Sequence, residues 1–179
     1  MKEIIYNYDN MNEDEVNNVI KRAKAVIINS NDEILLGYAD KTYQCIGGHV
    51  EDGEDECTCL MREIKEESGI NLKIKNIKPF LVIKYYSRNY PVEGLNTVTI
   101  NNYFIIRTEL KPNVDDNKLT DYEKEWGYTV KYIPKDKVLA RLRRSMHLAK
   151  KKNTVLDTVE AISEFIRITD NKITRVEWK

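Results

Sequence analysis

Three glutamates in one short segment have the residue type and spacing that a divalent metal ion requires. Glu66 and Glu67 follow Glu63 by three and four positions. On a helix this spacing directs all three side chains towards one neighbouring sector. Hard cations such as Mg²⁺ bind carboxylate oxygens together with water and phosphate oxygens. The segment therefore predicts a carboxylate site for Mg²⁺, with Mn²⁺ as the alternative ion.

A helix is predicted to carry these glutamates, preceded by a glycine loop at Gly47 and Gly48. Its apolar positions recur at helical spacing and would form the buried face: Cys57, Leu60, Met61 and Ile64. We expect the helix to run from about Glu54 to Ser68 and to stop at Gly69. An acidic run of this kind can also be the solvated face of a helix. The spacing of the glycines and Arg62 relative to the acids favours the metal site.

The segment from Gly48 to Ile70 resembles the signature of the Nudix hydrolase superfamily. That signature is Gly, five residues, Glu, seven residues, then Arg-Glu-aliphatic-any-Glu-Glu-any-Gly-aliphatic. Here it is filled by Gly48, Glu54, Arg62, Glu63, Ile64, Glu66, Glu67, Gly69 and Ile70. The chain departs from the family at Ile46, where members often carry a proline, but this position provides no metal ligand.

The resemblance implies that the chain hydrolyses a diphosphate linkage in a nucleoside diphosphate derivative, through attack of metal-activated water on phosphorus. It implies that Glu63, Glu66 and Glu67 bind the metal, with the backbone carbonyl of Gly47 as a further ligand. The chemistry suits these residues, because a densely anionic diphosphate must be neutralised before water can attack it. Metal ions that bridge phosphate oxygens supply this neutralisation and acidify the attacking water.

The resemblance leaves the general base open between two assignments. Glu63 is a candidate because a metal-bound water would lie within its reach. In some family members an acid on a distant loop has this role, and Glu123 or Glu125 is placed in the sequence to supply it. Arg62 is expected to orient the cluster, since Glu66 lies one helical turn away.

Gly48 and Glu54 are expected to support the metal ligands. Gly48 would provide a backbone conformation that other residues avoid. The resemblance makes Glu54 a carboxylate behind the ligands or an occasional ligand. An acid in the first helical turn is favoured equally well by the helix dipole alone. We interpret His49 as a polar loop residue near solvent and not as a catalytic histidine.

The remaining segments predict an α/β fold in one domain that spans residues 1–179. Strands before and after one helix, followed by two more helices, predict a mixed sheet covered on its faces. The resemblance implies the same α/β/α sandwich, with a loop–helix–loop against the sheet. The expected strands are Ala23–Asn29, Glu33–Tyr38, Asn71–Tyr86, Asn96–Arg107 and Gly127–Ile133. The expected further helices are Asn12–Lys21, Lys135–His147 and Thr154–Ile168, and Ile173–Trp178 is expected to be a terminal strand or tail.

Composition argues against nucleic-acid and membrane partners. The 29 basic residues balance the 29 acidic ones, so the chain has no strong net field. A basic run between Lys135 and Lys152 is explained better as the solvated side of an amphipathic helix than as an RNA site. The sequence contains no apolar stretch suited to a signal peptide or a membrane span. Three cysteines without disulfide spacing fit a reducing compartment, so we expect a cytoplasmic protein.

The substrate is left open by the sequence, as is the oligomeric state. Tyr86 is a weak candidate for substrate binding, because it lies sixteen positions after Ile70. Diadenosine-polyphosphate hydrolases of the superfamily have a tyrosine near this place, although aromatic residues are also simply common in strands. The alternative functions are a non-catalytic nucleotide-binding or regulatory domain and a diphosphate isomerase. The isomerase is disfavoured because no acid/base pair for that reaction is identified outside the signature.

Overall fold

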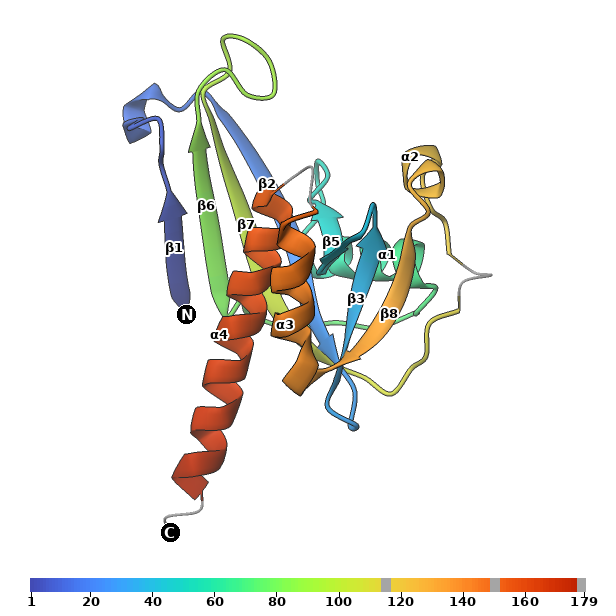
Figure 1. Ribbon diagram of the computed structural model, residues 1–179. Coiled ribbons are helices and arrows are strands. Elements are labelled where there is room, and N and C mark those ends of the chain that lie inside the picture. Colours follow the sequence, from blue (N-terminus) through green and yellow to red (C-terminus); the bar gives the residue numbers. More distant parts are fainter. Residues whose placement is uncertain (114–116, 149–151, 177–179) are drawn as a thin grey trace.

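An eight-stranded mixed sheet forms the centre of the protein, with helices on both of its faces (Figure 1). This computed structural model describes residues 1–113, 117–148 and 152–176. The strands are β1 (Lys2–Tyr6), β2 (Asn18–Ile28), β3 (Glu33–Ala39), β4 (Thr42–Gln44), β5 (Ile46–His49), β6 (Leu81–Ser87), β7 (Thr97–Arg107) and β8 (Thr129–Pro134). The helices are η1 (Glu13–Glu15), α1 (Glu56–Ser68), α2 (Asp121–Glu125), α3 (Lys135–Met146) and α4 (Lys152–Val176).

The long strand β2 organises the sheet. It pairs in parallel with β7 along its whole length, from Asn18 opposite Thr97 to Ile28 opposite Arg107. On its other side β2 pairs first with β5 and then, beyond residue 25, with β3. The order is β1-β6-β7-β2-β3-β4, with β5 on β2 and β8 on β3. The sheet therefore divides beside β5, which is the strand that leads into α1.

Alternating side chains of β2 build two separate cores. Ala23, Ala25 and Ile27 belong to a cluster with the apolar side of α1, including Leu60 and Ile64. The intervening Val26 and Ile28 belong to a second cluster with Leu142 of α3 and Phe165 of α4. This is the period-two pattern of a strand that is buried on both faces. The predicted α/β/α arrangement is confirmed, with α1 on one face and α3 and α4 on the other (Figure 1).

Helix α1 is closed by local signals at both ends. The side chain of Asp55 accepts a hydrogen bond from the backbone N–H of Thr58 at 2.7 Å, so Asp55 is the N-cap. Gly69 is in the left-handed conformation at the other end, as predicted, and its N–H donates to the carbonyl of Lys65. The predicted start at Glu54 is wrong, because Glu54 precedes the cap and lies outside the helix.

The helix predicted over Asn12–Lys21 is wrong. Only the single 3₁₀ turn η1 forms there, where the N–H of Asn12 donates to Glu15 Oε2 at 2.8 Å. From Asn18 onward the chain is already strand β2, paired with β7. The β-branched pair Val19–Ile20 suits this strand, and its long-range pairing outweighs the capping signal.

Other expectations also change in the structure. Of the strand predicted over Asn71–Tyr86, only Leu81 onward forms strand, and β1 was not predicted at all. Pro79 lies two residues before β6, and β6 is an interior strand, because it pairs with both β1 and β7. The C-terminal helix continues to Val176, so the terminal strand is wrong; residues 177–179 lie outside the described residues. In the described part of the chain, no helix combines the length and apolar character that crossing a membrane requires.

Candidate active site

Gly47 and Gly48 lie in strand β5 and not in a loop, which corrects the sequence prediction. Gly47 has φ +136°, and a Cβ there would lie 2.2 Å from the backbone oxygen of Ala23. A Cβ on Gly48 would lie 2.2 Å from Glu63 Oε1. At Gly47 the contact is with backbone, so this position needs glycine. Gly48 has no positive φ, so the special backbone conformation expected there is wrong, and a side chain at this position would instead displace the Glu63 carboxylate. The missing side chain at Gly48 is the space that the Glu63 carboxylate fills.

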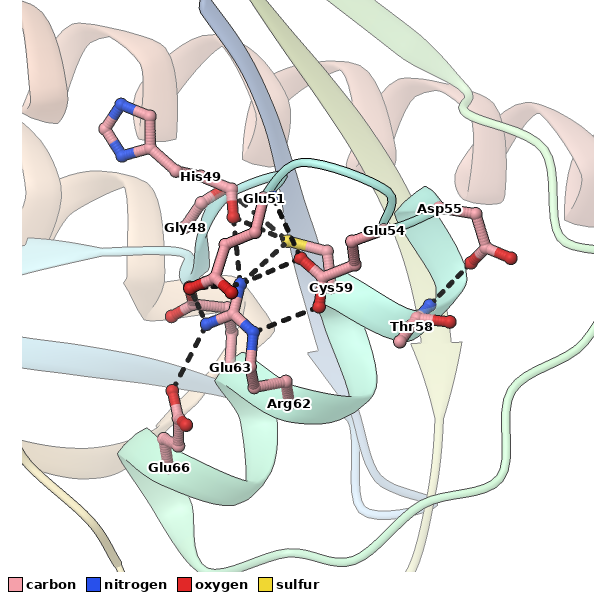
Figure 2. Close-up of polar contacts among 10 residues, drawn as sticks. All are labelled: Gly48, His49, Glu51, Glu54, Asp55, Thr58, Cys59, Arg62, Glu63 and Glu66. Atoms are coloured by element: carbon pink, nitrogen blue, oxygen red, sulfur yellow. Dashed lines mark hydrogen bonds and ion pairs between the residues drawn. The ribbon is translucent and has the colours of Figure 1, made fainter.

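Arg62 gathers the carboxylates of the signature around one guanidinium (Figure 2). Its Nε and Nη2 donate to the two carboxylate oxygens of Glu54, both at 3.0 Å. Its Nη1 donates to Glu63 Oε1 at 2.7 Å and to Glu66 Oε2 at 3.2 Å. Nη2 also donates to the backbone carbonyl of His49 at 2.9 Å. One arginine thus connects the turn before α1, strand β5 and two turns of the helix.

Glu54 owes its place to this arginine and not to the helix dipole. Its side chain is only 9% exposed, and it receives a paired hydrogen bond from Arg62. The backbone N–H of Glu51 donates to the same carboxylate at 3.1 Å. The Arg62 contact holds the pKa of Glu54 below its ordinary value, and the acids around Arg62 raise the pKa of the guanidinium. The role of Glu54 behind the metal ligands stays a prediction, whereas the first-turn interpretation is wrong, because Glu54 lies outside the helix.

Glu67 is the most buried glutamate of the signature. The residue is 5% exposed, and its Oε1 accepts a hydrogen bond from the backbone N–H of Gly47 at 3.1 Å. Glu63 and Glu66 are more open, with side chains 16% and 38% exposed. The hydrogen bond fixes the last turns of α1 against β5, so that the glycine strand and the carboxylate helix are held together.

The oxygen donors of this site suit a hard divalent cation. The carboxylate of Glu67 lies against the backbone of Gly47, that of Glu63 lies against Gly48, and that of Glu66 shares Arg62 with Glu63. Across the described residues, however, no three His, Cys, Asp or Glu side chains are gathered as a preformed metal site. Here Arg62 occupies the oxygens of Glu63 and Glu66. The assignment of Gly47, Glu63, Glu66 and Glu67 as ligands stays a prediction.

The distant candidates for the general base are only partly described. Glu125 is exposed at the end of α2, and the side chain of Glu123 lies outside the described residues. The segment that precedes α2 is attached to the end of α1. There the N–H of Lys118 donates to the carbonyl of Glu66 at 2.8 Å, and the N–H of Asn113 to that of Ser68 at 2.9 Å. The choice between Glu63, Glu123 and Glu125 therefore stays open.

Tyr86 points to another part of the molecule. Its hydroxyl donates to Glu13 Oε1 at 3.5 Å, in the N-terminal turn. Its role in substrate binding stays a weak prediction. His49 lies near solvent as predicted, at the end of β5, with Arg22 Nη2 3.4 Å from its Nε2. Burial and the neighbouring cation Arg22 lower the pKa of His49.

A second polar cluster, on the α4 face of the sheet, was missed from the sequence. Asp157 of α4 accepts a hydrogen bond from the Tyr85 hydroxyl and another, at 2.9 Å, from Asn101 Nδ2. Burial raises the pKa values of Asp157 and Tyr85. The sequence signal for this cluster was charged residues at alternate positions of an apolar strand, because Arg22 and Lys24 share one face of β2 with the buried Val26 and Ile28. The signal can be interpreted only when the helix that packs on this face is known.

Fold and site define an α/β protein whose carboxylate-bearing helix is held against a glycine strand of the sheet. The model of the NUDIX domain matches residues 20–148. The chain belongs to the Nudix family, which is typically a family of hydrolases. A comparison with curated proteins found no match to the sequence.

Solved structures show the same fold at low sequence identity. The Escherichia coli dihydroneopterin triphosphate pyrophosphohydrolase matches with a TM-score of 0.52 and 16% identity, over 82% of this chain and 94% of that chain. The E. coli ORF135 protein matches with a TM-score of 0.54 and 12% identity, over 85% of this chain and 91% of that chain. At these identities the likeness concerns the fold alone.

Proposed function

We propose that the protein is a divalent-metal-dependent pyrophosphohydrolase that cleaves a diphosphate linkage in a nucleoside diphosphate derivative. The observation that carries the proposal is the carboxylate cluster held by Arg62 and packed against Gly48. Membership of the Nudix family supports the same reaction class. The substrate within that class is left to experiment.

The chain's own residues would prepare the site in two ways. Arg62 holds Glu54 and Glu63 in fixed directions through hydrogen bonds of 2.7 to 3.0 Å. The N–H of Gly47 holds Glu67. Such support lowers the reorganisation that the carboxylates must undergo when they are used. When bound by Glu63, Glu66, Glu67 and the Gly47 carbonyl, Mg²⁺ or Mn²⁺ would neutralise the diphosphate and acidify the attacking water.

The proton of the attacking water needs an acceptor on the protein. Glu63 would serve if the substrate and cation released it from Arg62, because its side chain is partly exposed beside Gly48. Glu123 or Glu125 would serve from the segment after Lys118, which is attached to α1 at Glu66. Replacing each acid in turn by glutamine distinguishes the two arrangements through the pH profile of kcat.

The test of the proposal is a hydrolysis panel with product identification. Nucleoside triphosphates, ADP-ribose and dinucleoside polyphosphates are incubated with Mg²⁺, with Mn²⁺ and with EDTA. We expect turnover of at least one member with metal, and a loss of about 100-fold or more in Glu67→Gln. Asp52→Asn is the matched control, because Asp52 is exposed on the turn before α1. Binding of nucleotides without any metal-dependent turnover would instead favour a non-catalytic domain.

A further inference from the structure

On the face of strand β2 that is directed towards α4, the side chains change from apolar to positively charged. Val26 and Ile28 are apolar and belong to the core with α3 and α4. The next positions on the same face are Lys24 and Arg22. Lys24 is only 5% exposed. Two cations at alternate positions of one strand stand roughly 7 Å apart, so they repel each other unless negative charge lies between or beside them.

The neighbours of these cations leave polar atoms unused. In the register of the sheet, Arg22 lies opposite Asn101 and Lys24 opposite Tyr103 on β7. Asn101 and Tyr103 are 2% and 0% exposed. Within the described part of the chain, Arg22 Nε, Asn101 Oδ1 and the Tyr103 hydroxyl are buried without a hydrogen-bond partner. Such groups cost free energy unless water or a ligand satisfies them.

Asp157 does not form an ion pair with the two cations of this face. Asp157 is the carboxylate that faces the two cations, and both Lys24 and Arg22 lower its pKa against the effect of burial. Its oxygens already accept from Tyr85 and Asn101. No ion pair joins Asp157 to either cation among the interactions of the described residues. Glu160, one turn further along α4, is a second acid near Asp157 and raises its pKa. The two cations of β2 thus lie near carboxylates without forming an ion pair with Asp157.

This positive face adjoins the carboxylate cluster through a single strand. On β5, Gly47 lies opposite Lys24 and His49 opposite Arg22. Arg22 Nη2 lies 3.4 Å from the ring of His49, and the carbonyl of His49 accepts from Arg62. His49 is exposed and Arg22 is partly exposed, so the face is open to solvent at this end. His49 therefore connects Arg22 on one side of β5 with Arg62 on the other, at the solvent-exposed end of the strand.

We propose that Arg22 and Lys24, together with the Tyr103 hydroxyl, form an oxyanion subsite that binds a phosphate group of the substrate's diphosphate. Three hydrogen-bond donors on one face suit phosphate oxygens, and an arginine can bind two of them through its planar fork. The role as a substrate subsite rests on the proposed function. The binding of a free diphosphate does not, because it requires neither turnover nor metal.

The test measures binding of inorganic pyrophosphate by isothermal titration calorimetry in EDTA, at low salt. Wild-type protein is expected to bind, and Arg22→Gln to bind about tenfold to a hundredfold more weakly. Arg22→Lys keeps the charge but loses the fork, so we expect an intermediate affinity. Lys21→Gln is the control, since Lys21 is an exposed neighbour on the same strand and its replacement removes the same charge.

Two results would overturn the proposal. One is the absence of pyrophosphate binding to folded wild-type protein at millimolar concentrations, which would mean that only water satisfies the unused groups. The other is equal affinity in Arg22→Gln and Lys21→Gln. The affinity of Lys24→Met for pyrophosphate is compared as well, provided that its circular dichroism and melting temperature match those of wild type. If no substrate of the hydrolysis panel is turned over, the proposed function fails but the measured binding of pyrophosphate still stands. If a substrate is turned over and pyrophosphate binding does not depend on Arg22, the proposed function stands and only the subsite is ruled out.

Discussion

The two faces of strand β5 carry opposite charge. On the α1 side, one arginine is surrounded by Glu54, Glu63 and Glu66, so acids are in excess. On the α4 side, Arg22 and Lys24 act on Asp157, and Glu160 of the same helix is a further acid near Asp157. The chain as a whole has no net charge. The acids around Arg62 would attract cations, whereas Arg22 and Lys24, which form no ion pair with Asp157, would attract an anion.

The first way to break this contrast is to fill the space at Gly48. Gly48→Ala would place a methyl group 2.2 Å from Glu63 Oε1, so the carboxylate must move. We expect hydrolysis to fall about 100-fold or more, because small displacements of catalytic groups are costly. The measurement is kcat/KM on the best substrate of the panel. Gly53→Ala is the control, because nothing lies within 4 Å of its added Cβ although its φ is +80°. Equal rates in the two variants would contradict the role of Gly48.

A second change removes the positive centre of the acidic cluster. In Arg62→Met, Glu54 would keep a largely buried charge without its partner. We expect the free energy of unfolding to fall by about 2 kcal/mol, discounted for the partial exposure of Arg62, as measured by urea denaturation. Added Mg²⁺ should restore part of the loss if the released acids bind it. Arg88→Met is the control, because it breaks the solvent-exposed pair with Glu15 and should change stability far less.

A third change sharpens the positive face. Asp157→Asn removes the carboxylate that opposes Arg22 and Lys24 while keeping its shape. We expect the affinity for pyrophosphate in EDTA to rise about threefold to tenfold, because a repulsive charge near the anion is lost. The measurement is the same calorimetric titration used for Arg22. Asp136→Asn is the control, since Asp136 is exposed in the first turn of α3. Unchanged or weaker binding in Asp157→Asn would argue against an anion at this place.

The smallest expected effect is an opposite response of the two faces to pH. Arg62 lowers the pKa of Glu54 below 4.5, so its stabilising contribution is complete above that value and is lost as the pH falls further. Burial raises the pKa of Asp157 above 3.8, so its contribution to stability decreases as the pH rises through the raised pKa. We therefore expect the stability difference between wild type and Glu54→Gln to shrink on acidification below pH 4.5. Over the same series of urea titrations, acidification should raise the free energy of unfolding of wild type relative to that of Asp157→Asn.

Local patterns allowed much of the fold to be predicted. The strand pair on either side of residues 30–32, the long hairpin strand β7 and helix α1 with its Gly69 stop each follow from neighbouring residues. The failures involve competition with distant partners. Asn12 and Glu15 do form a capping contact, but β7 recruits Asn18 and the following residues into the sheet. Strand β1 has few local signals and exists because it pairs with β6.

The candidate site divides in the same way. The glutamates, the arginine and the glycines were readable because all of them lie within one continuous signature. The contact between Glu54 and Arg62 was not readable, because the two residues are eight positions apart and lie in different elements. The contrast between Arg22 and Asp157 was still less accessible, because strands β2, β6 and β7 and helix α4 must come together before those charges face each other.

By itself, the amino-acid sequence determined the chemistry available to this protein: a set of carboxylates at helical spacing, next to glycines and one arginine. Tertiary structure alone decided which of these groups share a hydrogen-bond donor and which are buried. It also decided that Arg22 and Lys24 lie on the opposite side of strand β5 from the carboxylates. The reason is physical. Helical spacing depends on the backbone geometry of consecutive residues, whereas burial and charge balance depend on side chains that packing brings together from distant segments.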